Sequence, residues 1–219
     1  MHWLRWSGHQ VISLKQAYEA LFKGVSLPTR SVVISFDDGF QDFYDYAFPV
    51  LQEFGYPSIV YVVAGLIGQP AKWLAEGDRA GDETIMSAEI LRIIHKGQVE
   101  IGAHTMSHAV LPKLSATQQA EEIGNSKRVL EEVLGEAIES FAYPYGVYNP
   151  GVRDAVAAAG FKTGLTVNRG LANLAPNPYE IPRKAISWGD NCLGFFHKLL
   201  LDNKLKRRPK EGLINSHHY

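Results

Sequence analysis

The stretch SFDDGF at residues 35–40 decides how this chain is interpreted. It follows the β-branched run VVI at residues 32–34, which predicts a buried strand ending at the two aspartates. Gly39 permits a sharp turn directly after them. Adjacent carboxylates at the end of a core strand are costly to remove from water unless a cation or hydrogen bonds compensate. Asp37 and Asp38 therefore require a partner from elsewhere in the chain, unless they simply cap a following helix, which the pair alone leaves open.

The sequence HTMSH at residues 104–108 offers that partner. Two imidazoles four residues apart can face one cation if the segment between them makes about one turn, and a carboxylate completes a triad of metal ligands. Because Asp37 and Asp38 are consecutive in an extended chain, their side chains point in opposite directions. We therefore expect one aspartate to bind the ion and the other to act as a base toward water.

Strand and helix patterns alternate along the chain, which predicts an α/β fold with a mostly parallel sheet, open or closed into a barrel. Residues 64–84 are too long for an ordinary connection and predict a surface lid or binding loop. The two acids, the two histidines and YPYG at residues 143–146 each follow a predicted strand, so they should share the carboxyl-end rim of the sheet. The predicted strands cover residues 31–36, 58–63, 98–103, 138–143, 162–167 and 181–188, and the predicted helices cover 13–24, 43–54 with an interruption at Pro49, 87–97, 115–135, 149–160 and 193–201.

Composition excludes several classes of protein. The net charge of −1 argues against a general nucleic-acid binder, which needs a basic surface. The single cysteine, Cys192, excludes an intrachain disulfide framework and a cysteine-based zinc site, and we expect it to be a small apolar filler. No apolar run is long enough to span a membrane, and residues 1–6 lack the apolar region of a signal peptide. As read, the chain has no targeting signal and would be cytoplasmic. If the N-terminus is trimmed, an extracytoplasmic location is also compatible with the sequence, so the localisation stays open.

Three motifs in order, SFDDGF, HTMSH and FAYPYG, closely resemble the first three motifs of the polysaccharide deacetylases, the NodB-homology or carbohydrate esterase family 4 group. The flanking pattern resembles the branch that acts on poly-N-acetylglucosamine. The resemblance implies a distorted barrel of parallel strands with outer helices, spanning a catalytic domain over residues 1–203 that precedes a basic tail at 204–219. It also implies an N-acetylated glycan as substrate, while the oligomeric state stays open.

By the same resemblance, Asp37 is the catalytic base, and Asp38, His104 and His108 bind a divalent metal, commonly zinc. The implied reaction is hydrolysis of an N-acetyl group by water held at the metal, releasing acetate and a free amine. The backbone N–H of Tyr145 is implied as a donor to the tetrahedral oxyanion. Tyr143, Tyr145, Tyr148 and Trp188 are candidates for stacking on sugar rings or, alternatively, for the core.

The chain departs from the family pattern in two places. Many members begin the third motif with an arginine that orients the catalytic aspartate, whereas this chain has Phe141-Ala142 there. Arg183, on a late predicted strand, is the candidate replacement, with a surface strand residue as the alternative. The family's fifth motif supplies a histidine acid, and here only LINSHH at residues 213–218 is a loose match, which makes His217 a weak candidate.

Two other functions are compatible with these residues. An amidohydrolase of the same fold could act on a small non-sugar amide, because the metal chemistry does not require a carbohydrate. A catalytically silent module could retain the fold and bind glycan without turning it over. The intact Asp37 and the three intact ligands favour the enzyme, whereas the missing motif arginine and the loose match of the fifth motif, which supplies the acid, favour the silent module.

Overall fold

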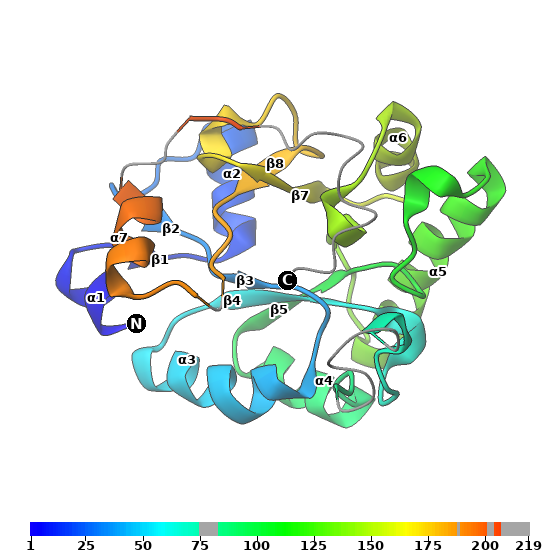
Figure 1. Ribbon diagram of the computed structural model, residues 1–219, viewed down its shortest axis with the longest axis horizontal. Coiled ribbons are helices and arrows are strands. Elements are labelled where there is room, and N and C mark those ends of the chain that lie inside the picture. The colour runs from blue at the N-terminus through cyan, green and yellow to red at the C-terminus, as the bar shows by residue number, and fades with distance from the viewer. Residues whose placement is uncertain (75–82, 188, 201–203, 207–219) are drawn as a thin grey trace.

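A curled sheet of six parallel strands forms the centre of the computed structural model, which describes residues 1–74, 83–187, 189–200 and 204–206 (Figure 1). The strands lie in chain order, and each pairs with the next in parallel. Among the described strands, β8 does not pair with β3, so the curled sheet is an incomplete barrel. The predicted distorted barrel is confirmed. The strands are β3 (Ser35–Phe36), β4 (Ser58–Val62), β5 (Val99–Ala103), β6 (Ser140–Ala142), β7 (Thr163–Arg169) and β8 (Ile181–Arg183).

Helices surround this sheet, and most begin and end where the sequence predicts (Figure 1). Three of these helices begin directly after a serine: Ser13, Ser87 or Ser115. Each serine hydroxyl accepts a hydrogen bond from the backbone N–H three residues later, which satisfies one free donor in the first turn. The helices are α1 (His2–Trp6), α2 (Leu14–Lys23), α3 (Phe48–Phe54), α4 (Ala88–Lys96), α5 (Ala116–Leu134), α6 (Pro150–Ala158) and α7 (Cys192–Leu200). No helix among these described residues is long and apolar enough to cross a membrane.

Several predicted boundaries were wrong. The strand predicted at 31–36 is two strands: β2 (Ser31–Val32) pairs with β1 (Gln10–Val11) in a separate sheet, and β3 begins three residues later. Pro49 lies at the start of α3, where its missing N–H is tolerated, and a π-helical turn (Phe43–Ala47) precedes it. The strand predicted at 181–188 ends at Arg183 among the described residues, and Cys192 is exposed rather than a core filler.

The strands alternate their side chains between two apolar layers. Along β4, Val60 and Val62 belong to the layer under the outer helices, whereas Ile59 and Tyr61 belong to the layer inside the curl of the sheet. Tyr61 is fully buried there, and its hydroxyl shares a hydrogen bond of 2.7 Å with Ser140 Oγ. The interior of the barrel is therefore filled by side chains.

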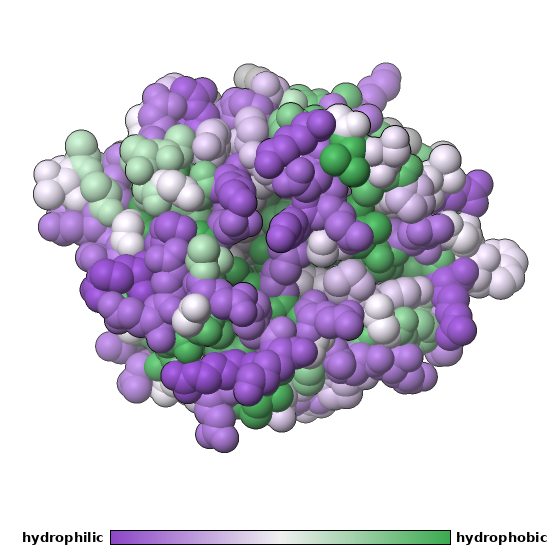
Figure 2. All heavy atoms as spheres, turned by 180° about the vertical axis from the view of Figure 1, so that it is seen from behind, coloured by the Kyte–Doolittle hydropathy of each residue, from purple (hydrophilic) through white to green (hydrophobic). Residues whose placement is uncertain are grey.

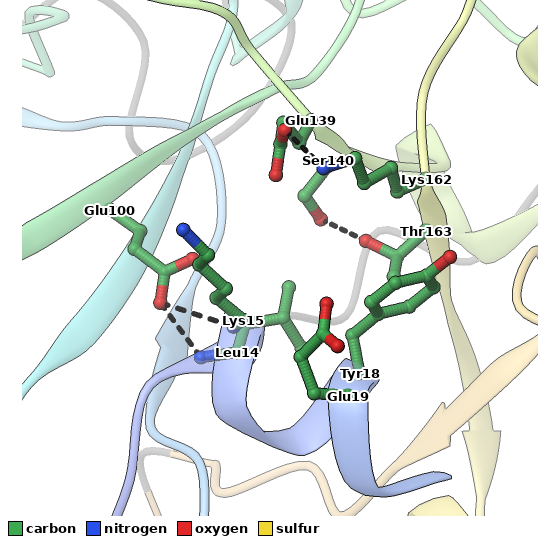
Figure 3. Close-up of a pocket in the computed structure, with 9 residues that line it drawn as sticks. All are labelled: Leu14, Lys15, Tyr18, Glu19, Glu100, Glu139, Ser140, Lys162 and Thr163. Carbon is green, nitrogen blue, oxygen red and sulfur yellow. Dashed lines mark hydrogen bonds and ion pairs between the residues drawn. The ribbon is translucent and has the colours of Figure 1, made fainter. Parts of the chain in front are cut away.

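Helix α2 covers the amino ends of the strands. Figure 3 shows Lys15, Tyr18 and Glu19 projecting from α2 into a small pocket whose other walls include Glu100 and Ser140. Its volume of about 20 Å³ suits a water molecule and not a sugar, so this pocket at the amino ends of the strands is not a substrate site.

The face seen in Figure 2 is mostly hydrophilic, with hydrophobic side chains in scattered patches. A substrate site must therefore be sought at the carboxyl ends of the strands, opposite the small pocket beside α2.

Gly102 is required by the packing of Tyr61. A Cβ at this position would lie 2.4 Å from Tyr61 Cε1 and 3.1 Å from the Ser140 carbonyl oxygen. We expect Gly102→Ala to lower the free energy of unfolding by about 1–3 kcal/mol, the usual cost of overpacking a core. Urea unfolding followed by circular dichroism measures this change.

Gly124→Ala in α5 is the matched control for that substitution. A Cβ at Gly124 meets no atom within 4 Å. Alanine there should raise stability by up to about 1 kcal/mol, because glycine is a poor helix former. Equal stability of the two variants would contradict the close approach of Tyr61 to Gly102.

Candidate active site

The carboxyl ends of the parallel strands bring the predicted residues to one rim. Asp37 and Asp38 directly follow β3, His104 directly follows β5, and Arg183 is the last residue of β8. Tyr145 lies in a short 3₁₀ turn (Pro144–Gly146) after β6. Residues far apart in the sequence therefore meet because consecutive parallel strands end at the same edge.

Asp37 forms a two-pronged ion pair with Arg183. Arg183 Nη1 donates to Asp37 Oδ1 at 2.8 Å, and Nη2 donates to Oδ2 at 2.7 Å. The guanidinium also donates from Nε to the Thr166 carbonyl at 3.0 Å and from Nη1 to Ser35 Oγ at 3.2 Å. The arginine that sequence analysis assigned to Asp37 therefore contacts it, and it is not a surface strand residue.

The charges of this pair stabilise each other. Burial alone would raise the pKa of Asp37, but the Arg183 guanidinium more than offsets it and holds the pKa below the usual range. Burial alone would lower the pKa of Arg183, and the Asp37 carboxylate more than offsets that effect. Asp37 is consequently an ionised carboxylate fixed in orientation, which is the state that a general base requires.

Asp38 points away from Asp37, toward the two histidines. Its Oδ1 lies 3.4 Å from His104 Nε2 and 3.2 Å from His108 Nε2. One ligand atom from each residue lies within 4.8 Å of the others. Of the two acids, Asp38 pairs with the imidazoles and Asp37 pairs with Arg183, whereas their roles as ligand and base stay predictions.

These three side chains fit a divalent cation. His104 Nδ1 lies 2.8 Å from the Ala142 carbonyl, which can only accept, so Nδ1 carries the hydrogen and Nε2 is directed at Asp38. Asp38 Oδ1 is buried and makes no hydrogen bond with a described residue. Burial favours neutral groups, yet the imidazoles hold the pKa of Asp38 below its usual value and the carboxylates hold that of His104 above it. Two nitrogens and one oxygen around a buried negative charge are a donor set that zinc accepts.

His108 is held between two aromatic rings. The Trp73 indole stacks on it with ring centroids 4.4 Å apart, and the Tyr145 ring meets it edge-on at 4.5 Å. Burial lowers the pKa of His108, which favours the neutral imidazole that ligates metals. Sequence analysis did not assign Trp73; its position in the long 64–84 segment was the only signal.

The remaining predicted residues have different positions. Tyr143 is a core residue, 1% exposed, and its hydroxyl donates to the Tyr179 carbonyl. Tyr148 is half-buried and donates to Glu180 Oε1 at 2.9 Å. Trp188 and His217 lie outside the described residues. Lys206 exchanges two backbone hydrogen bonds with Arg169, whereas most of the predicted tail at 204–219 is not described, and the domain division stays a prediction.

A family model for polysaccharide deacetylase matches residues 24–164. The chain belongs to the polysaccharide deacetylase family. The match covers well over half of the sequence and contains all three motifs from which the resemblance was inferred. The family predicted from those motifs is therefore confirmed.

Two curated relatives support this assignment. The poly-β-1,6-N-acetyl-D-glucosamine N-deacetylase of Escherichia coli K12 is 30% identical over an alignment of 228 residues that covers 90% of this chain and 34% of the relative. The enzyme of the same name from Staphylococcus aureus MSSA476 is 26% identical, over 84% of this chain and 64% of the relative. The chain thus spans about a third of one relative and under two thirds of the other.

Solved deacetylase structures share the fold. The Streptococcus pyogenes deacetylase PplD, in complex with acetate, superimposes with a TM-score of 0.77 at 24% identity, covering 90% of this chain and 82% of that one. IcaB from Ammonifex degensii gives a TM-score of 0.74 at 25% identity, covering 85% of this chain and 81% of that one. These two solved structures therefore share the fold of this chain.

The cluster of Asp38, His104 and His108 leads to a prediction about metal binding. We expect His104→Gln to weaken Zn²⁺ binding by at least about a hundredfold, because one of three protein ligands is lost. Competition with a chromophoric chelator measures the dissociation constant. His95→Gln is the control, since His95 pairs with Glu136 away from the site. Equal affinities of the two variants would refute the assignment of His104 as a ligand.

Proposed function

We propose that this chain hydrolyses the N-acetyl groups of an N-acetylhexosamine polysaccharide. The observation that carries the proposal is the ionised, clamped Asp37 directly beside the Asp38, His104 and His108 cluster on one rim. Amide hydrolysis needs a base for the attacking water and a Lewis acid for the carbonyl, and a cation held by this cluster would be that Lewis acid. A silent binding module would not need the clamp on Asp37.

In the proposed reaction, Asp37 accepts a proton from the attacking water. The water oxygen bonds to the acetyl carbon, and the C–N bond breaks as the proton taken by Asp37 passes to the leaving nitrogen, which releases acetate and an amine. A divalent cation held by Asp38, His104 and His108 would supply Lewis-acid polarisation of the acetyl carbonyl. Because Arg183 engages both Asp37 oxygens, the carboxylate is held in one orientation and stays ionised until it takes the proton.

Tyr145 is proposed to donate its backbone N–H to the oxyanion. It has a left-handed backbone, with φ at 56°, between Pro144 and Gly146. This conformation is costly for a residue with a side chain, so the surrounding turn must hold it. A donor of this kind typically lowers the barrier by about 3 kcal/mol.

We propose poly-β-1,6-N-acetylglucosamine as the polymer. The support is the name that the E. coli and S. aureus relatives share and the coverage of most of this chain by both alignments. The ring of Tyr145 and the indole of Trp73, both next to His108, offer apolar faces for a sugar. Zinc is the proposed metal because the ligands are two imidazoles and one carboxylate.

Acetate release from a β-1,6-linked N-acetylglucosamine oligomer tests the proposal. Release should vanish after chelation and return with Zn²⁺, and Asp37→Asn should lower it by about a hundredfold or more while Zn²⁺ stays bound, because a general base contributes at least that much. A β-1,4-linked oligomer and a small acetamide are the comparison substrates. Bound Zn²⁺ without acetate release from any of them would refute the enzyme, and preferential turnover of the small amide would refute the polymer.

Arg183 gives a second prediction. Arg183→Met should lower turnover by about a hundredfold with Zn²⁺ affinity unchanged, because Asp37 loses its orientation and compensating charge. Arg128→Met is the control, since Arg128 is exposed on α5 and pairs there with Glu132. The double variant with Asp37→Asn should be no slower than Asp37→Asn alone. Additive losses would show that Arg183 acts independently of Asp37.

A further inference from the structure

The segment between the two histidines is held by an acidic residue of another element. Glu122, on α5, accepts the backbone N–H groups of Met106 at 2.9 Å and Ser107 at 3.0 Å through Oε2. Its Oε1 accepts the Ser107 hydroxyl at 2.7 Å. One carboxylate therefore fixes both residues that immediately precede His108.

The same segment is anchored on its other side. Ala64 N–H donates to the Thr105 carbonyl at 2.9 Å, and Gly65 N–H donates to the Met106 carbonyl at 3.0 Å. A Cβ on Gly65 would lie 2.4 Å from that Met106 oxygen, so only glycine permits this approach. The carbonyls of Thr105 and Met106 thus face residues 64–65, and the N–H groups of Met106 and Ser107 face Glu122.

This segment has an unfavourable backbone that needs external support. Thr105 and His108 both have left-handed backbones, with φ at 67° and 60°. Residues with side chains keep this conformation only where surrounding contacts impose it. Inside the segment, Thr105 Oγ1 accepts the His108 N–H at 2.9 Å, and the remaining N–H contacts come from Glu122. Without them, the segment would keep only its contacts with residues 64–65 and the Thr105 hydroxyl, and the backbone would fix the direction of His108 less tightly.

We propose that Glu122 is a positioning residue that sets the direction of His108 and thereby the affinity of the cation site. The inference rests on the proposed function, because it takes Asp38, His104 and His108 as the ligands. Glu122 contacts the chain between the ligands and not the ligand atoms. Its carboxylate is suited to the task because it accepts three hydrogen bonds at once, and charge makes each of them stronger than a neutral one.

Direct measurement of metal binding tests this proposal. The dissociation constants of Zn²⁺ and Co²⁺ are measured by chelator competition for Glu122→Ala and Glu122→Gln, each against the same change at Glu121, the exposed neighbour on α5. We expect Glu122→Ala to weaken binding about tenfold, the lower end for loss of an outer partner. Glu122→Gln, which keeps one oxygen acceptor, should weaken it about threefold, with a changed ligand-field spectrum of bound Co²⁺ in both.

The outcomes separate this proposal from the proposed function. If the unsubstituted protein binds no Zn²⁺, the cation site itself fails. If it binds Zn²⁺ but the Glu122 and Glu121 variants have equal affinities and equal Co²⁺ spectra, the positioning role is overturned. If Glu122→Ala does not fold, Glu122→Gln compared with Glu121→Gln decides in the same way. Acetate release by Glu122→Ala should also recover as Zn²⁺ is raised, whereas a catalytic role would leave it low at saturation.

Discussion

The ion pair between Asp37 and Arg183 connects the first and last strands of the curled sheet across 146 positions of sequence. Strands β3 and β8 do not share a ladder in the described chain, so the side chains span the opening that the backbone leaves. The pair is half-buried, with the Asp37 and Arg183 side chains 32% and 17% exposed. Partial burial strengthens the attraction, and four hydrogen bonds from the guanidinium offset much of the cost of removing its charge from water.

Backbone strain concentrates at the same rim. Six described residues other than glycine have a positive φ, and four of them lie at this rim. These four are Asp38, Thr105, His108 and Tyr145, and the other two are Arg30 and Gln98. All four belong to the three motifs. Each such residue costs about 1–3 kcal/mol, which the remaining fold must supply. The two buried layers of the sheet are the source, so the stability of the barrel and the geometry of the site are coupled.

Local signals made most of the fold predictable. Capping serines, terminal glycines and β-branched runs act within a few residues, so the helices and the strand order could be inferred from sequence. The choice of partner strand is not local, and for this reason the division of residues 31–36 between two sheets was missed. The proposed ligand set followed from the family motifs, but Glu122 and Trp73 reach the site only through tertiary packing. Helix periodicity gives one signal for Glu122: it lies beside the buried positions Gln119 and Ile123 of α5.

Arg183 occupies a different element from the arginine of the family pattern, but it contacts the same carboxylate. In the pattern inferred from the motifs, the arginine belongs at the start of the third motif, where this chain has Phe141 and Ala142. Here Phe141 faces the outer helices and Ala142 faces the interior, in the same layer as Tyr61. The Arg183 guanidinium lies over the Tyr61 ring, 5.8 Å from its centroid, so Arg183 reaches the same interior layer from β8. The proposed chemistry needs one guanidinium on Asp37, and in this chain the curl of the sheet lets that group come from β8.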